Sequence, residues 1–471
     1  MLGLVLCSYL SLASTTFSVS LKQIHSNPNQ NLKNSHKDGI DADLTNYYNS
    51  QYTGSMIIGS NNQSFNLIFD TSSPWIWVLN STTNAPKMSS KFNCILSLTC
   101  RYATQSSGDF IKGEYFAFSK NVNVEGIMAS DYISFPNSRV VNQSFLIMNE
   151  EHADLLAGVS IDGVCGLSLR NGNKSPTLLK HLKKTGLIER EIFSLYLHSN
   201  PEAYEEEGSE ILFGGINPNK KIGNFVNVTV DDSPYWEAKL TNIFMIAGNT
   251  SSEINKNASR VVFDSGIHTL KMPKVDFILL TKSLKQDFGL SCSYLAFAKN
   301  TYSCNCEDGN IKAFPNITFV IGTTVLTIPP SQYLMIKKNN CILLIDSFTV
   351  LETTQGNYEE KEDLSNKPNG DPENYIVLGT PFFRSYYSVF DADNMTISFA
   401  QPVKQKKQLV TSLELVYLIF GIFIFILFCS LVVCTVRIWT NKNENTKKES
   451  VNFDHIITDR SASGASYRPI N

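Results

Sequence analysis

Two apolar runs of this chain each end in an aspartate that is followed directly by a hydroxyl residue. The first is Leu67-Ile68-Phe69-Asp70-Thr71 and the second is Val261-Val262-Phe263-Asp264-Ser265. Such a run predicts a buried strand, and a carboxylate at its end is costly to bury unless it is paired. The repetition therefore predicts two similar halves that bring Asp70 and Asp264 face to face. Two carboxyls in contact cannot both ionise, so one would act as a base and the other as an acid.

The residues around the two aspartates resemble the pepsin-like aspartic proteases. In that family each lobe carries an apolar-apolar-Asp-Thr/Ser-Gly turn, and an apolar-apolar-Gly segment follows later in the same lobe. Val164-Cys165-Gly166 and Val377-Leu378-Gly379 stand at those places, and the likeness covers residues 50 to 402. The resemblance implies an all-β, bilobal fold with a few short helices, and lobes over residues 46–225 and 226–402.

The resemblance also assigns roles to the residues of both turns. Asp70 and Asp264 would be the catalytic pair, and the hydroxyls of Thr71 and Ser265 would lock the turns together across the lobe interface. Ser73 would donate a hydrogen bond to the outer oxygen of Asp70 and help to keep it ionised. The supporting residues that the resemblance implies are Thr71, Ser73, Trp77, Ser265 and Gly266.

The two turns depart from the family pattern at one position each. Ser72 stands where the first turn usually has glycine, which adds a Cβ where two backbones approach closely. Ile267 stands where the second turn usually has threonine or serine. Asp264 therefore lacks one hydroxyl donor, and we expect its pKa to be higher than the family pattern implies.

The tyrosine of the family's lid has no clear counterpart. Counting back from Gly126 without a gap places Ser119 at its position. Phe118 or Tyr115 could take this role only if the loop has slipped or gained residues.

The cysteines indicate a disulfide-bonded, lumenal body. Cys94 and Cys100 bracket a small loop where the family often has a disulfide, and four more cysteines of the second half allow two bridges in three pairings. By analogy with the family we favour the pairs Cys306–Cys341 and Cys292–Cys304. Cys165 is expected to be a buried thiol. The candidate glycosylation sequons begin at Asn62, Asn80, Asn142, Asn227 and Asn316.

The N-terminal 45 residues suggest a targeting segment and a leader. Residues 1–13 are apolar and end in small residues, which indicates a signal peptide, with a buried first strand as the alternative. Residues 14–45 are polar and predict an exposed leader. In the resembled family an inhibitory prosegment lies here, and Lys22 is the nearest match to its basic residue; a plain linker is the other interpretation.

An uncharged apolar run from 415 to 436 is long enough to cross a bilayer as a helix. A buried helix of a soluble protein is the alternative. With a cleaved signal peptide the protein would be a single-pass type I membrane protein, with a linker over 403–414 and a cytosolic tail over 437–471. The tail ends in Tyr467-Arg468-Pro469-Ile470, which resembles a sorting signal of the endolysosomal pathway.

Charge and motif content narrow the function further. The net charge of −3 gives no reason to expect a nucleic-acid partner. The histidines lack metal-ligand spacing and no Gly-X-Ser-X-Gly motif occurs, so we expect neither a metal, a cofactor nor a serine nucleophile. The sequence thus predicts a monomeric, membrane-anchored aspartic endopeptidase that hydrolyses peptides or proteins at acidic pH in the secretory or endolysosomal pathway or at the cell surface. A type I glycoprotein that binds peptides in the same cleft without cutting them is the alternative.

Overall fold

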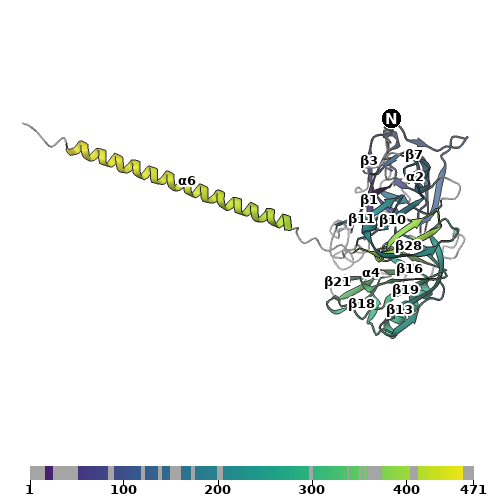
Figure 1. Ribbon diagram of the computed structural model, residues 1–471. Helices are drawn as coiled ribbons and strands as arrows, with labels where there is room; N and C mark the ends of the chain where they lie inside the picture. The colour runs from purple at the N-terminus through teal and green to yellow at the C-terminus, as the bar shows by residue number, and fades with distance from the viewer. Residues whose placement is uncertain are drawn as a thin grey trace, which may run out of the picture. The chain divides into compact units, whose positions relative to one another are not determined.

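The structure is a computed structural model in which residues up to Lys404 form one compact unit and residues from Gln405 form a second (Figure 1). The residues that it describes are 16–24, 51–82, 90–117, 122–135, 141–148, 161–170, 176–198, 205–295, 301–337, 339–348, 353–354, 357–358, 374–403 and 412–459. The first unit consists mostly of β-strands with a few short helices, so the predicted all-β fold class is confirmed.

Strands dominate the first half of this unit because apolar and polar residues alternate along them. In β3, for example, Phe65, Leu67 and Phe69 are buried while Ser64 and Asn66 are exposed. The strands of this half are β1 Phe17–Ile24, β2 Gln51–Ile58, β3 Gln63–Asp70, β4 Trp77–Leu79, β5 Arg101–Tyr102, β6 Lys112–Ala117, β7 Val122–Ser134, β8 Val141–Met148, β9 Gly163–Gly166, β10 Ile192–Tyr196, β11 Glu205–Phe213 and β12 Lys221–Thr229.

The second half repeats this pattern with shorter strands. They are β13 Glu237–Ala247, β14 Thr250–Glu253, β15 Arg260–Phe263, β16 Leu270–Met272, β17 Cys292–Tyr294, β18 Tyr302–Asn305, β19 Asn316–Ile321, β20 Thr324–Ile328, β21 Leu334–Lys337, β22 Asn340–Leu343, β23 Ile345–Ser347, β24 Thr353–Thr354, β25 Asn357–Tyr358, β26 Tyr375–Leu378, β27 Tyr387–Asp391 and β28 Thr396–Pro402. Helices are few, namely α2 Leu178–Lys184, α3 Lys274–Gln286, α4 Pro330–Tyr333 and α5 Thr380–Phe383, with 3-10 turns at Cys94–Leu96, Pro218–Lys220 and Glu307–Gly309. The first turn of α2 is capped by the Thr177 hydroxyl, which accepts from the Lys180 amide.

The same four-strand arrangement occurs once in each half. β3 runs parallel to β9, which pairs antiparallel with β4, which in turn runs parallel to β8. β15, β26, β16 and β23 repeat these relations in the second half. A Cβ on Gly166 would lie 2.3 Å from the Trp75 carbonyl oxygen, and one on Gly379 would lie 2.1 Å from that of Thr269. Only glycine permits this approach, which explains the two apolar-apolar-Gly segments.

One sheet joins the two halves. It places β27 beside β10, β28 beside β27 and β12 beside β28, so its strands come from both ends of the unit. The rings of Phe193 in β10 and Phe390 in β27 stack with their centroids 4.6 Å apart. The expected lobe boundary at 225/226 falls inside β12, because this strand belongs to the shared sheet.

The expectation of an exposed leader over residues 14–45 is wrong for Phe17–Ile24. These residues form β1, which pairs with β11 along most of its length and with β2 at its end. Val19 and Leu21 are buried, and alternate with exposed Ser18 and Ser20. The polar composition of the segment as a whole hid this short alternating stretch. Residues 1–13, the predicted signal peptide, and the side chain of Lys22 lie outside the described residues.

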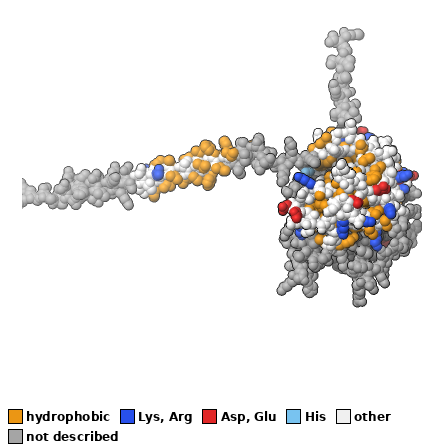
Figure 2. Space-filling view, turned by 90° about the horizontal axis from the view of Figure 1, so that it is seen from below, with side chains coloured by type: hydrophobic (Ala, Val, Ile, Leu, Met, Phe, Trp, Pro, Cys, Tyr) orange, Lys and Arg blue, Asp and Glu red, His pale blue; other side chains and the backbone are white. Residues whose placement is uncertain are grey.

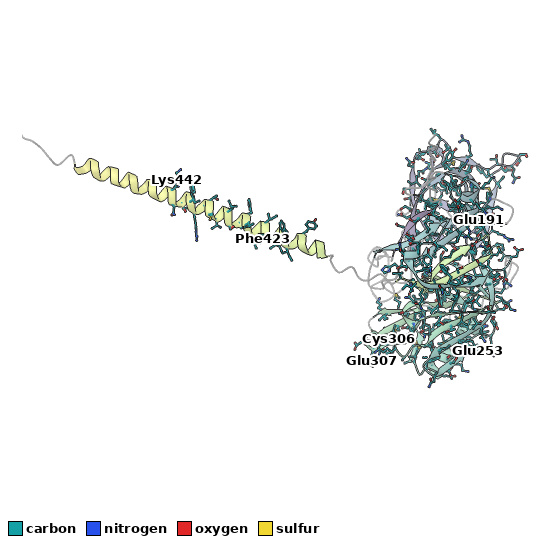
Figure 3. The ribbon with its side chains drawn as sticks, viewed as in Figure 1. Glu191, Glu253, Cys306, Glu307, Phe423 and Lys442 are labelled. Atoms are coloured by element: carbon teal, nitrogen blue, oxygen red, sulfur yellow. A yellow bond between two sulfur atoms is a disulfide. The ribbon has the colours of Figure 1, made fainter. Side chains whose placement is uncertain are left out.

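The three expected disulfides are present. The bridges join Cys94 to Cys100, Cys292 to Cys304, and Cys306 to Cys341. The last two hold the four-stranded sheet β17-β18-β22-β21, and Figure 3 labels Cys306 within this half. Cys165 is a buried thiol, as expected, and its burial raises the pKa well above the usual range.

The second unit contains one long helix, α6 Ser412–Asp459. Its stretch Ile419–Asn443 contains an 18-residue window with a mean hydropathy of 2.9 and is long and apolar enough to cross a membrane. Hydrophobic side chains surround this stretch (Figure 2), and Phe423 and Lys442 mark its apolar and charged parts (Figure 3). The apolar span predicted over 415–436 is thus part of a longer helix, which begins inside the predicted linker 403–414 and continues through much of the predicted tail 437–471.

Most of the candidate glycosylation sites are accessible. Four of the five asparagines are exposed, namely Asn62, Asn142, Asn227 and Asn316. Asn80 is half-buried. Exposure is necessary for modification, and the five sites stay predictions.

The disulfides differ in the length of chain that they close, and this difference predicts unequal effects on stability. Removing Cys306–Cys341, which are 35 residues apart, should destabilise the fold by about 4 kcal/mol, because the unfolded chain regains the most freedom. Removing Cys94–Cys100, which are 6 residues apart, should cost about 2 kcal/mol. Urea unfolding of the two Cys→Ser double variants measures both values, and the reverse order would contradict this account.

Candidate active site

Four reciprocal hydrogen bonds join the ends of β3 and β15. The Thr71 hydroxyl donates to the Phe263 carbonyl at 2.6 Å and accepts from the Ser265 amide at 3.0 Å. The Ser265 hydroxyl donates to the Phe69 carbonyl at 2.6 Å and accepts from the Thr71 amide at 3.1 Å. All these groups are buried, so each bond satisfies a donor and an acceptor that water cannot reach. The turns are thereby held together as the resemblance implied.

This lock brings the two aspartates into contact. The carboxyl groups of Asp70 and Asp264 lie close enough for each to shift the pKa of the other, which favours a proton on one of them. Asp264 is fully buried, and its Oδ2 has no hydrogen-bond partner among the described residues. A Cβ on Gly266 would lie 2.6 Å from the Asp70 Cγ, so the second turn rests directly on the carboxyl of the first.

The two carboxyls receive unequal numbers of hydrogen bonds. The Oδ1 of Asp70 accepts from the Ser72 amide at 2.7 Å, the Ser72 hydroxyl at 2.8 Å and the Ser73 amide at 3.2 Å. The Oδ1 of Asp264 accepts from the Gly266 amide at 2.8 Å. Since donors stabilise the ionised form, Asp70 is the better site for the negative charge and Asp264 for the proton.

The expected role of the Ser73 hydroxyl is wrong. It donates to the Trp75 carbonyl at 3.0 Å, and only the Ser73 amide reaches Asp70. The Ser72 hydroxyl takes its place, because the side chain at the usual glycine position points toward the carboxyl. The sequence signal for this contact is the hydroxyl of Ser72, two residues after the aspartate. The prediction considered only the added Cβ of this residue and not its hydroxyl.

Electrostatics agree with the difference in donors. Burial raises the pKa of Asp70, and the Ser72 and Ser73 donors offset part of that rise. Burial, followed by the charge of the neighbouring Asp70, raises the pKa of Asp264 well above its usual range. Such a pair can keep one proton at pH values at which isolated carboxyls are fully ionised. With one carboxyl ionised and the other protonated, the pair can act as base and acid together.

Ile267 explains part of the difference between the two carboxyls. Its side chain is buried and packs in an apolar cluster with Val262 and Val377, against the partly buried Tyr235 and Tyr375. A hydroxyl residue here could donate to Asp264, whereas isoleucine gives only apolar contact. The expected lack of a donor therefore has a visible physical basis in the second turn.

An apolar wall lies beside the first turn. Trp77 is buried within a cluster that also contains Ile68, Leu146 and Val164. Trp75, which the sequence analysis did not single out, belongs to this cluster and is buried, and its Nε1 has no hydrogen-bond partner among the residues that the structure describes. A Cβ on Gly113 would lie 3.1 Å from its Cζ2, so β6 packs directly against the indole ring.

The lid candidates lie in or next to the β6–β7 hairpin. Its strands pair from Lys112–Ile127 to Ala117–Val122. Tyr115 lies in β6 opposite Val124, but its side chain is outside the described set. Phe118 and Ser119, the other two lid candidates, also lie outside the described residues, so all three stay predictions.

The raised pKa of Asp264 predicts how stability depends on pH. The folded protein keeps a proton that the unfolded chain releases once the pH passes the ordinary carboxyl range, so the free energy of unfolding falls as pH rises toward neutrality. Asp264→Asn removes this titration and should stabilise the protein at neutral pH. Urea unfolding between pH 4 and 7 measures the slope, with exposed Asp308→Asn as control. An unchanged slope in Asp264→Asn would contradict the assignment.

Comparison with known proteins places this arrangement in a family. The sequence model of the eukaryotic aspartyl proteases matches residues 51–402. The chain is 27% identical to Pepsin B of Canis lupus familiaris over 76% of this chain and 83% of the relative. It is 25% identical to Cathepsin D of Gallus gallus, over 76% and 83%, and 27% identical to Cathepsin E of Rattus norvegicus, over 78% and 83%. The protein that carries these two facing turns belongs to the eukaryotic aspartyl protease family.

Proposed function

We propose that this protein is a membrane-anchored aspartic endopeptidase that works at acidic pH. The observation that carries the proposal is the contact between half-buried Asp70 and fully buried Asp264, in which one carboxyl receives three donors and the other receives one from its own turn. Unequal carboxyls that share a proton are suited to activate water on one side and to protonate substrate on the other.

In the proposed reaction Asp70 is the base and Asp264 the acid. The ionised Asp70 takes a proton from a water that attacks the carbonyl carbon of the scissile amide. Protonated Asp264 donates to the carbonyl oxygen, and the tetrahedral intermediate forms. Asp70, now protonated, gives its proton to the leaving nitrogen as the C–N bond breaks, while Asp264 recovers its proton from the hydroxyl of the intermediate.

The surroundings support a peptide as substrate. The buried apolar cluster around Trp75 and Trp77 lies directly beside the first turn, and the β6–β7 hairpin packs on that cluster. Apolar walls with a few polar groups are typical of sites that bind side chains of an extended ligand. The apolar stretch of α6 would hold the enzyme in a membrane of the secretory or endolysosomal pathway or at the cell surface, as a type I protein with the protease unit lumenal or extracellular.

The proposal predicts that Asp70→Asn loses activity on a denatured protein substrate at pH 4 to 5. Removing the base should lower kcat at least about 100-fold, because general base catalysis contributes this much or more. A statine-type transition-state mimic should inhibit the wild type in the same assay. Tight binding of peptides without any cleavage by the wild type would overturn the proposal in favour of a peptide-binding protein.

Ile267→Thr tests the difference between the two carboxyls. A hydroxyl at this position should donate to Asp264 and lower its pKa, which moves the alkaline limb of the kcat/KM profile to lower pH. Ile267→Val is the matched control, since it shortens the side chain without adding a donor. A limb that moves equally in both variants would show that packing, and not hydrogen bonding, sets the profile.

A further inference from the structure

The loop closed by the Cys94–Cys100 disulfide exposes three aliphatic side chains. Ile95 is 88% exposed, Leu98 83% and Leu96 60%. The first two values exceed that of every large apolar side chain described in α6, where Tyr417 reaches 69%. Single exposed apolar residues are ordinary, but three in one short loop mark an interaction site.

A disulfide and several hydrogen bonds fix the conformation of the loop, and this conformation keeps the three side chains exposed. The disulfide closes it, and the Asn93 side chain caps its 3-10 turn by accepting from the Ile95 amide at 3.0 Å. The Ser60 hydroxyl accepts from the Leu98 amide at 2.9 Å, and the Thr99 hydroxyl donates to buried Asp131. A loop that is ordered before binding loses little conformational entropy on contact.

Most backbone amides of the loop are already hydrogen-bonded within the protein, which suits an apolar medium. Five of its seven amide donors have partners within the protein, namely those of Ile95, Leu96, Ser97, Leu98 and Cys100. Arg101 covers two carbonyls as well, since its guanidinium donates to the Leu98 oxygen at 3.0 Å and the Cys100 oxygen at 2.7 Å. Groups that are satisfied internally can enter lipid without the cost of breaking bonds to water.

The flanking residues suit a membrane interface. No acidic residue occurs between Asn93 and Arg101, and Arg101 itself places a cation at the base of the apolar tip. Tyr102 follows it, partly exposed, with its ring centroid 5.1 Å from that of Phe110. Aromatic and basic side chains are typical of the headgroup level of a bilayer.

Two observations favour lipid over a protein as the occupant. A stable protein interface takes about 20–30 residues a side, whereas this patch offers three protruding side chains. A bilayer needs no complementary socket, and the same chain carries the candidate membrane helix α6. A weak interfacial contact becomes effective when a tether holds the two surfaces at high local concentration.

We propose that the 94–100 loop is an interfacial anchor of the protease unit. Ile95, Leu96 and Leu98 insert into the boundary between headgroups and acyl chains, and Arg101 binds lipid phosphates. The contact sets how the substrate-binding side of the unit is oriented on the membrane. It rests on the membrane-anchor part of the proposed function and is independent of catalysis.

The experiment uses the full chain in nanodiscs of phosphatidylcholine with phosphatidylserine. Leu98→Trp places a fluorophore on the loop, and Val325→Trp, at a 60% exposed position in β20, is the matched control. Emission is compared between discs of ordinary and of brominated lipid, and the signal of the natural tryptophans is subtracted with the wild type. We expect blue-shifted emission from residue 98 that brominated lipid quenches, and neither effect at residue 325.

Further variants test the parts of the anchor. Adding Ile95→Ser and Leu96→Ser to Leu98→Trp should reduce the quenching, and Arg101→Gln should reduce its dependence on phosphatidylserine. Equal emission in the two kinds of disc would overturn the proposal, as would equal quenching at residue 325. A blue shift without quenching would also overturn it and indicate a protein contact. Failure of the chain to enter discs at all would contradict the membrane anchor itself, which separates the two proposals.

Discussion

The exchange of hydrogen bonds between Thr71 and Ser265 is the interaction on which the rest of the site depends. Each hydroxyl donates to a carbonyl of the opposite turn and accepts from an opposite amide, so each fixes two backbone groups at once. Behind them, β9 and β26 run parallel to β3 and β15 and hold the strand ends in place. The close approach that follows leaves room only for a hydrogen at Gly266, beside the Asp70 carboxyl.

A symmetric framework thus supports an asymmetric pair of acids. The four strands around each turn pair in the same way in both halves, yet Ser72 adds a donor on one side and Ile267 withholds one on the other. Burial alone would raise both carboxyl pKa values, and the donors decide which carboxyl keeps the proton. The two departures from the family pattern therefore have the same effect on where the negative charge lies. Ser72 stabilises a charge on Asp70, and Ile267 leaves Asp264 less able to carry one.

Several features were accessible from the sequence because they depend on short, local patterns. The paired aspartates, the apolar-apolar-Gly segments and the grouping of six cysteines all follow from residue type and order, and the resemblance supplied the disulfide pairing. Other features depend on what surrounds a residue after folding. β1 was missed because its alternation is short, and its partner β11 lies far along the chain. The Ser73 hydroxyl was misplaced because two serines compete within one turn, and geometry decides between them.

By itself, the order of residues determined that two strand-ending aspartates would face each other, that the body would consist of strands, and that one stretch would suit a bilayer. These outcomes follow from hydrophobic periodicity and from the cost of burying an unpaired charge, both of which are properties of the local sequence. Only the tertiary structure decided which hydroxyl serves Asp70, how Trp75 meets β6, and where β1 joins the shared sheet. Such contacts depend on distances and directions between distant segments, and those exist only once the chain has packed.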